Sequence, residues 1–193
     1  MAPETGGLPA NSTADSTADL VTGLIVDVPD FPKPGVTFSD ITPLLASPNG
    51  LAAAVAGLAA SAPEGIDAVV ALEARGFIFG GPVALALGVG FVPVRKPNKL
   101  PREHISVTYD LEYGTETLAL HADALTPGQR VLVVDDVLAT GGTIAAATGL
   151  VRALGAEVAA VSVVLELGFL RGRARLETVG LTDVHALVTS TGA

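Results

Sequence analysis

Residues 131–143 (VLVVDDVLATGGT) join a short apolar run to two acids and a segment rich in threonine and glycine. The apolar run predicts a buried strand, and Asp135 and Asp136 follow it at the edge of the predicted sheet. Gly141 and Gly142 permit positive φ and close backbone approach, so that successive N–H groups can point at one anion. The segment therefore predicts a strand, a phosphate-binding loop and the N-terminus of a helix.

Strands and helices are predicted to alternate on both sides of this segment. The predicted strands cover residues 68–72, 91–94, 131–134, 158–165 and 184–188, and the predicted helices cover residues 49–61, 77–87 and 143–154. Two weaker alternating segments, residues 105–109 and 116–121, predict partly exposed strands. The pattern is typical of an α/β fold with a mainly parallel twisted sheet flanked by helices. Ligands of such sheets bind beyond the carboxyl ends of the strands.

The chain has 193 residues, of which 11 are basic and 20 acidic, so its net charge is −9. Although 49% of the residues are hydrophobic, no apolar run reaches the about 18 residues that a membrane span needs. A soluble protein that does not bind membranes is expected, and the acidic balance disfavours nucleic acid as a partner. The chain has no cysteine, which excludes disulfides and thiolate metal sites.

One domain is expected over residues 20–193, because the length suits a single sizeable core. Residues 1–19 are rich in serine, threonine, alanine, glycine and proline, a composition that predicts a disordered tail. This tail has neither a basic residue nor an apolar stretch, so a secretory signal or transit peptide is not expected and a cytoplasmic location is favoured. Residues 31–41 contain two prolines, a glycine and two phenylalanines and predict a structured loop that leads into a short strand.

The predicted loop suits a monophosphate, since the Thr140 and Thr143 hydroxyls add donors to its backbone N–H groups. No Gly-Lys pair occurs in the chain, which argues against the phosphate loop of a nucleoside triphosphatase. Two acids one loop away fit the hydroxyls of a ribose 5-phosphate. Adjacent acids can also simply end a strand and begin a turn, but their combination with Ala-Thr-Gly-Gly-Thr at this spacing favours the binding site.

Basic residues gather in one region of this acidic chain: Arg75, Arg95, Lys96, Lys99 and Arg102. Such a cluster suggests a small polyanionic ligand, and the alternative is a set of solvated loop charges. A second run, Arg171, Arg173 and Arg175, is interpreted as a solvated face or a helix C-terminal charge, with contact to a partner subunit as the alternative. The three histidines are dispersed and do not form a metal-ligand spacing.

Residues 131–143 resemble the phosphoribosyl-pyrophosphate motif of the type I phosphoribosyltransferases. Four further segments resemble, in the same order, those of the adenine-specific members of that family: residues 31–41 (FPKPGVTFSDI), 73–77 (EARGF), 94–101 (VRKPNKLP) and 111–114 (LEYG). In the family they correspond to the purine-covering segment, the pyrophosphate loop, the root of the mobile catalytic loop and the segment that closes over the base. Members often carry a basic residue where Ser39 stands, and many carry Asp-Ser where this chain has Glu73-Ala74.

This resemblance implies the type I phosphoribosyltransferase fold, with a small N-terminal hood over about residues 20–45 and a mobile β-loop. It implies an enzyme of purine salvage in which a ring nitrogen of adenine displaces pyrophosphate from ribose C1 of phosphoribosyl pyrophosphate, giving AMP. Mg²⁺ is the implied cofactor, bound through the substrate and water, with Asp135 and Asp136 as the protein groups nearest to it. The resemblance also implies a homodimer.

Individual residues receive roles from the same resemblance. The ribose 5-phosphate would be bound by Asp135, Asp136, Ala139, Thr140, Gly141, Gly142 and Thr143. The pyrophosphate would be bound at Glu73, Ala74, Arg75, Gly76, Arg95, Lys96 and Lys99, and the base at Phe31, Val36, Thr37, Phe38 and Tyr113. The catalytic candidates are Glu112, which would exchange a proton with the purine, and the cations Arg75 and Arg95.

Alternatives stay open at the level of the sequence. The enzyme could act on another base, such as hypoxanthine, xanthine or orotate, or the chain could be a regulatory module that binds the phosphoribosyl group without catalysis. Glu112 could be an ordinary exposed acid of a loop. The phenylalanines Phe31, Phe38 and Phe77 could pack in the core instead of stacking on a purine.

Overall fold

The computed structural model describes residues 12–110 and 114–192. These residues form two compact units that divide between Ala53 and Ala54, and each unit is described by itself. None of the described helices is long and apolar enough to cross a membrane.

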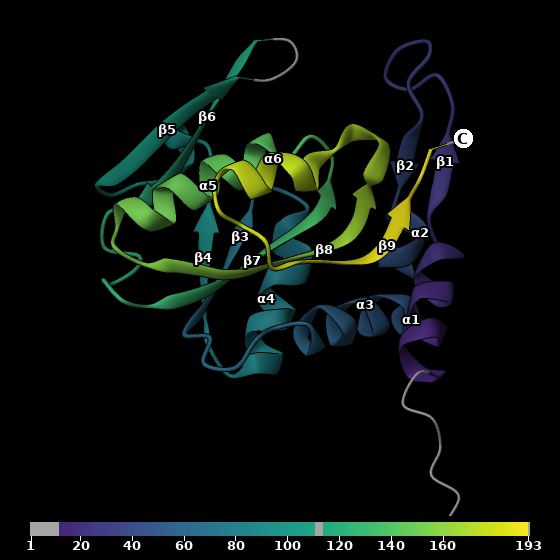
Figure 1. Ribbon diagram of the computed structural model, residues 1–193, viewed down its shortest axis with the longest axis horizontal. Coiled ribbons are helices and arrows are strands. Elements are labelled where there is room, and N and C mark those ends of the chain that lie inside the picture. The colour runs from purple at the N-terminus through teal and green to yellow at the C-terminus, as the bar shows by residue number, and fades with distance from the viewer. Residues whose placement is uncertain (1–11, 111–113, 193) are drawn as a thin grey trace, which may run out of the picture. The chain divides into compact units, whose positions relative to one another are not determined.

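A five-stranded parallel sheet forms the centre of the C-terminal unit (Figure 1). Its spatial order is β4 (Gly90–Val94), β3 (Ala68–Leu72), β7 (Arg130–Leu138), β8 (Glu157–Leu167) and β9 (Val184–Ser190). Every neighbouring pair in this sheet is parallel. The predicted strands are thus confirmed, as is the α/β class.

Helices cover both faces of this sheet, as Figure 1 shows, with α4 (Gly76–Leu87) on one face and α5 (Gly142–Ala153) and α6 (Gly172–Thr178) on the other. All five residues of β3 are buried, and so are the four apolar residues that open the β7 segment, Val131 to Val134. Burial on both faces explains why these strands are continuously apolar rather than alternating.

Strand β7 extends further than the sequence predicts. Its pairing with β3 ends at Val134, but its pairing with β8 continues to Leu138. Asp135 and Asp136 therefore lie inside the strand, just past the point where β3 stops, and not in the loop that follows. One side of the β7 backbone is left without a neighbouring strand there, so the two acids stand at the open carboxyl edge of the sheet.

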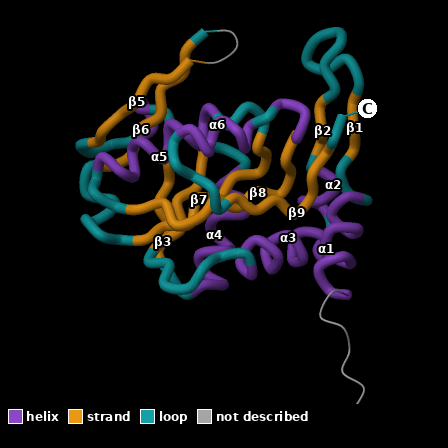
Figure 2. Tube along the Cα trace, in the orientation of Figure 1, coloured by secondary structure: helices purple, strands orange, loops and turns teal. Residues whose placement is uncertain are grey.

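An antiparallel hairpin accompanies the main sheet. Strands β5 (His104–Asp110) and β6 (Thr115–His121) pair in register, with Tyr109 opposite Glu116. A short bridge between Arg95 and Ala119 ties β6 to the residue that follows β4, and β5 packs against α5. Figure 2 shows the hairpin strands beside the helical layer of this unit. The two weak alternating segments of the sequence are thus confirmed as strands.

The N-terminal unit is built around a small antiparallel ribbon. It contains α1 (Ser12–Thr22), β1 (Val26–Val28), β2 (Phe38–Asp40), α2 (Thr42–Ala46) and the beginning of α3 (Pro48–Ala60). The Ser47 hydroxyl accepts a hydrogen bond from the N–H of Gly50 at 3.1 Å, and Pro48 occupies the first turn of α3, as the sequence predicts.

The predicted disordered tail is wrong for residues 12–19, which belong to α1. Ala18 and Val21 are three residues apart and so share one helix face, and Val21 is fully buried. The high content of serine and threonine conceals this spacing. Residues 1–11 lie outside the described part of the chain. The sequence reasoning also missed two short helices, α2 and α6.

Candidate active site

The loop between β7 and α5 has the features of an anion site. Gly141 adopts φ +78° and precedes the first residue of α5, and no side chain caps that helix end. The first N–H groups of an α-helix have no partner within the helix, and their partial positive charge favours an anion. The first turn of α5 contains no acidic residue, so an anion at this helix end would meet no like charge from that turn. The phosphate site at Ala139–Thr143 stays a prediction.

Asp135 and Asp136 lie beside this loop in different surroundings. Oδ1 of Asp135 accepts the N–H of Asp136 at 3.0 Å, and a Cβ atom on Gly76 would stand only 2.7 Å from that oxygen. Gly76 therefore lets the carboxylate approach the N-terminus of α4. Asp136 is 5% exposed, and its Oδ2 lies 2.7 Å from Nε of Arg75.

Burial shapes the titration of both acids. It raises the pKa of Asp135 well above the ordinary range, and the neighbouring charge of Asp136 raises that pKa further. Burial also raises the pKa of Asp136, against the lowering effect of the Arg75 guanidinium. Simultaneous ionisation of the pair is thus opposed in the free protein.

The pair also bears on metal binding. Apart from the contact with Arg75, Oδ2 of Asp136 is buried and accepts no hydrogen bond from any described residue. The described residues form no cluster of three or more histidines and acids that could hold a metal ion. Two neighbouring carboxylates, of which Asp136 is buried and paired with Arg75, fit a cation whose other ligands come from substrate and water.

Glu73 and Arg95 form the centre of the second part of the site. Nη2 and Nε of Arg95 donate to the two carboxylate oxygens of Glu73 at 2.9 and 3.3 Å, and the backbone N–H of Lys96 donates to Glu73 at 3.1 Å. The hydrogen bond from Arg95 lowers the pKa of Glu73. The carboxylate of Glu73 thus fixes the arginine and the chain after β4, which is a positioning role that the sequence did not suggest.

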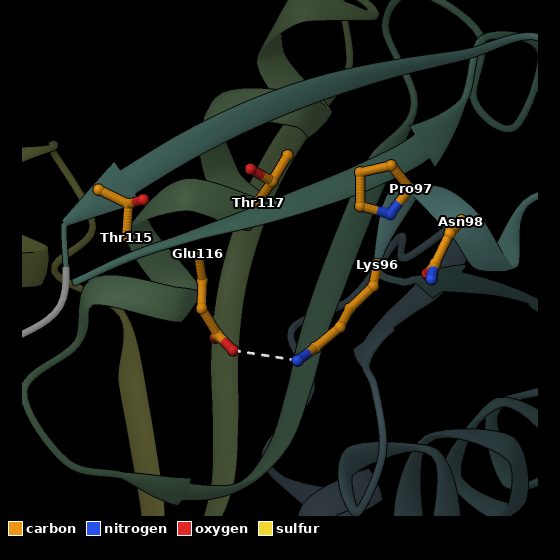
Figure 3. A pocket seen from close by; sticks show the side chains of 6 residues that line it. All are labelled: Lys96, Pro97, Asn98, Thr115, Glu116 and Thr117. Carbon is orange, nitrogen blue, oxygen red and sulfur yellow. Dashed lines mark hydrogen bonds and ion pairs between the residues drawn. The ribbon is translucent and has the colours of Figure 1, made fainter. Parts of the chain in front are cut away.

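Lys96 has a partner on the hairpin. Its Nζ lies 3.1 Å from Oε1 of Glu116, and Figure 3 shows the two side chains facing each other across a pocket. Lys96, Pro97, Asn98, Thr115, Glu116 and Thr117 line this pocket. Arg75, Arg95 and Lys96, three of the predicted pyrophosphate cations, therefore each contact a carboxylate of the protein.

Tyr109 is a site residue that the sequence reasoning missed. Its hydroxyl lies 3.2 Å from Oγ1 of Thr143 and 3.1 Å from Oε2 of Glu116, and burial raises its pKa. It thereby links the hairpin to the predicted phosphate loop. In the sequence, Tyr109 is marked only by its place in an alternating segment that predicts a strand. That pattern does not indicate a contact with Thr143 or Glu116.

The predicted base residues divide into two groups. Phe31, Val36, Thr37 and Phe38 belong to the N-terminal unit, where Phe31 is 51% exposed and its ring meets that of Phe38 edge-on at 5.3 Å. Ser39, at one of the departures from the family pattern, donates to Oδ1 of Asp27 across the ribbon at 2.8 Å. Glu112 and Tyr113 lie outside the described residues.

Phe77 takes a packing role in the C-terminal unit. Its ring meets Phe91 edge-on at 5.6 Å, and the guanidinium of Arg95 lies 5.9 Å from its centroid. Of the second basic run, Arg173 is not a solvated charge as expected. It donates to the buried carboxylate of Glu166 at 2.6 Å and to the carbonyl of Val184 at 2.6 Å.

Comparison with known proteins agrees with this geometry. The family model of the phosphoribosyl transferase domain matches residues 40–181. Adenine phosphoribosyltransferase of Cutibacterium acnes is 58% identical over 171 residues, which are 89% of this chain and 97% of that protein. The corresponding protein of Streptomyces coelicolor is 59% identical over 173 residues, which are 89% of this chain and 95% of that protein.

Solved structures give the same result. The crystal structure of adenine phosphoribosyltransferase from Thermoanaerobacter pseudethanolicus has a TM-score of 0.85 at 47% identity, over 90% of this chain and 99% of that chain. The Saccharomyces cerevisiae enzyme, solved with adenine and an imino-altritol bisphosphate, has a TM-score of 0.83 at 40% identity, over 90% of this chain and 99% of that chain. This chain therefore belongs to the adenine phosphoribosyltransferases of the type I phosphoribosyltransferase family.

Proposed function

We propose that this protein transfers the 5-phosphoribosyl group of phosphoribosyl pyrophosphate to adenine, giving AMP and pyrophosphate in purine salvage. The observation that carries the proposal is the pair Asp135 and Asp136 at the open edge of β7, followed after residues 137–141 by the N-terminus of α5, which no described side chain caps. The relatives of this chain that are 55–60% identical to it bear the name of that enzyme.

In this proposal the loop binds the 5-phosphate through the N–H groups of residues 139–143 and the hydroxyls of Thr140 and Thr143. The carboxylates of Asp135 and Asp136 accept hydrogen bonds from the ribose hydroxyls. Their negative charge also favours the positive charge that develops on the sugar as the bond to pyrophosphate breaks. A sugar phosphate therefore places its anionic end on the helix and its reacting carbon near the acids.

The leaving pyrophosphate is stabilised by Arg75, Arg95, Lys96 and Lys99. Three of these cations contact Asp136, Glu73 and Glu116 in the free protein. Pyrophosphate binding then replaces internal ion pairs by ion pairs to the leaving group. Such preorganised charge is most effective when it is aimed at the site where negative charge develops.

Mg²⁺ fits this site through Asp135 and Asp136, whose carboxylates would hold it directly or through its waters. When bound, the ion neutralises the charge of the pyrophosphate and favours its departure. Its positive charge also supports ionisation of the two acids, which burial opposes in the free protein.

The base is recognised, in this proposal, by the segment that contains Phe31, Val36, Thr37 and Phe38, together with Tyr113. Backbone N–H and C=O groups at Thr37 would pair with the edge of adenine, and polar pairing of this kind rejects the wrong base most strongly. Glu112 would exchange the proton of the purine nitrogen.

The active form is proposed to be a homodimer. Ile78, Leu85 and Phe91 are large apolar side chains that are 39, 83 and 38% exposed. Ile78 and Leu85 are seven residues apart on α4 and hence on one helix face, and Phe91 lies on β4, which α4 contacts. A second copy of the chain would cover this surface. Sedimentation should give twice the monomer mass, and Leu85→Asp should reduce it.

Release of pyrophosphate from phosphoribosyl pyrophosphate, measured with each base in turn, tests the proposal. Adenine should support the fastest release. A faster rate with hypoxanthine, xanthine or orotate would assign the enzyme to another base. Binding of phosphoribosyl pyrophosphate without pyrophosphate release in the presence of any base would favour a regulatory module instead.

A further inference from the structure

The predicted phosphate loop has no positively charged side chain of its own. Residues 139–143 are Ala-Thr-Gly-Gly-Thr, whereas a phosphate monoester carries a charge of about −1.5 to −2 at pH 7. The chain as a whole has a net charge of −9, which opposes the binding of an anion. A cation close to the loop would therefore contribute strongly to the affinity for a sugar phosphate.

Helix α6 lies directly against this loop. A Cβ atom on Gly172, the first residue of α6, would collide with the carbonyl oxygen of Ala139. A Cβ atom on Gly141 would lie 2.7 Å from the carbonyl oxygen of Gly172. Both contacts are possible because glycine stands at each position, so the backbone of the helix rests on the backbone of the loop.

Arg175 uses this contact to reach the loop. Residues three apart share one face of a helix. Arg175 therefore lies on the same face of α6 as Gly172, which contacts the loop. A Cβ atom on Gly142 would lie 3.3 Å from Nη1 of Arg175 and 3.6 Å from Cδ2 of Tyr109. The guanidinium therefore lies over the first residue of α5, beside the ring of Tyr109.

No residue in the described part of the chain engages the charge of Arg175. Arg175 is exposed, and in the described part of the chain its guanidinium has neither an ion-pair partner nor a hydrogen-bond partner. Arg173, two residues earlier, shows the contrast, because its guanidinium is held by the buried carboxylate of Glu166 at 2.6 Å. An unpaired guanidinium beside an uncapped helix N-terminus suits a bound anion.

We propose that Arg175 binds the 5-phosphate and completes the phosphate site from α6. This inference rests on the proposed role of residues 139–143 in holding the 5-phosphate. The planar guanidinium offers paired N–H donors to phosphate oxygens, and its charge adds to that of the α5 N-terminus. Arg175 thus binds the ribose 5-phosphate half of the substrate. The pyrophosphate half is bound by the other cations, Arg75, Arg95, Lys96 and Lys99.

The test is Arg175→Gln, with the affinity for ribose 5-phosphate and for magnesium pyrophosphate measured separately by calorimetry. Removal of a charged hydrogen bond should weaken ribose 5-phosphate by about tenfold and leave pyrophosphate within about twofold. The KM for phosphoribosyl pyrophosphate should rise while kcat stays close to that of the parent. Arg175→Lys should recover part of the loss, since it keeps the charge but not the paired donors.

Two further variants separate the possible outcomes. Arg152→Gln removes the same charge from an exposed arginine that donates to the carbonyl of Val179, and it should change neither affinity. Thr143→Val alters the loop itself. If Thr143→Val weakens ribose 5-phosphate and Arg175→Gln does not, the role of Arg175 is refuted and the loop site stands. If neither variant weakens it, both ideas are refuted. Equal losses for ribose 5-phosphate and pyrophosphate would show a general charge effect and also refute the role of Arg175.

Discussion

Asp135→Asn separates stability from activity at the proposed ribose site. The carboxylate of Asp135 accepts the N–H of Asp136 at 3.0 Å and fills the space that the absent side chain of Gly76 leaves open. Asparagine has nearly the same shape, and its Oδ1 can still accept that hydrogen bond. The substitution therefore removes one negative charge with little change in packing, and we expect a protein that is more stable but far less active.

The charge that is removed is unfavourable in the free protein. Burial is the main cause of the raised pKa of Asp135, and the charge of Asp136 comes next. Two unit charges roughly 5 Å apart repel by about 3 kcal/mol at an effective dielectric constant of about 20. Arg75, whose Nε lies 2.7 Å from Asp136, offsets part of this repulsion. We expect a net gain of about 1–2 kcal/mol in the free energy of unfolding, or about 2–8 °C in Tm for a chain of this size.

The gain should depend on pH in a defined direction. The folded protein raises the pKa of Asp135 above its unfolded value of about 3.9, so the folded state holds this proton more tightly than the unfolded state does. The contribution of Asp135 to stability is therefore lost as the pH rises from about 4 through the raised pKa. The Tm difference between Asp135→Asn and the parent should be largest at neutral pH and should vanish below about pH 4.

Thermal unfolding of both proteins without ligand, followed from pH 4 to pH 8, measures this difference. Asp123→Asn is the matched control, because Asp123 lies at the surface and its hydrogen bond with Arg102 lowers its pKa. That variant should not gain stability at neutral pH. Turnover of Asp135→Asn should fall by about a hundredfold or more, as for the loss of one strong electrostatic contact in a transition state. A lower Tm than the parent at pH 7, or unchanged turnover, would refute the reasoning.

Three further substitutions test other residues of the proposed site. Gly76→Ala would place a methyl group 2.7 Å from Oδ1 of Asp135. The resulting shift should lower the free energy of unfolding, measured by chemical denaturation, by about 1–3 kcal/mol and should also lower kcat. Tyr109→Phe removes the hydroxyl that contacts Thr143 at 3.2 Å, so unfolding should become about 1 kcal/mol easier and the KM for phosphoribosyl pyrophosphate should rise more than that for adenine. Glu112→Ala should lower kcat by about a hundredfold or more while KM changes little, and equal effects on both constants would mean that Glu112 only shapes its loop.

The elements that the sequence predicts well are those whose cause is local. The apolar run before Asp135 has the pattern of a doubly buried strand, and the glycines after Thr140 have the pattern of a loop that begins a helix. Both are confirmed. Where β7 ends could not be predicted, because strand pairing with β8 extends it to Leu138. That extension depends on a partner about thirty residues further along the chain.

The site contacts that the sequence did not predict are those between segments far apart in the chain. Tyr109 meets Thr143, and Glu73 meets Arg95, although nothing in the spacing of either pair indicates a contact. The role of Glu73 was assigned to pyrophosphate from its position in the resembling loop. Because a carboxylate repels pyrophosphate, its observed hydrogen bonds to Arg95 give it a physically simpler task, which is to hold that cation in place.

The ion pairs of the free protein connect substrate binding with the proposed role of a divalent cation. Pyrophosphate that draws Arg75 or Lys96 out of its ion pair leaves Asp136 or Glu116 without that partner. An anion that arrives without a cation would leave one of these carboxylates unpaired. Asp136, at 5% exposure, would be the costlier of the two to leave unpaired, because it is buried. A substrate that brings its own divalent cation supplies the charge that Asp136 loses. The affinity of this site for phosphoribosyl pyrophosphate should therefore depend on magnesium more steeply than its affinity for ribose 5-phosphate, which leaves these ion pairs intact.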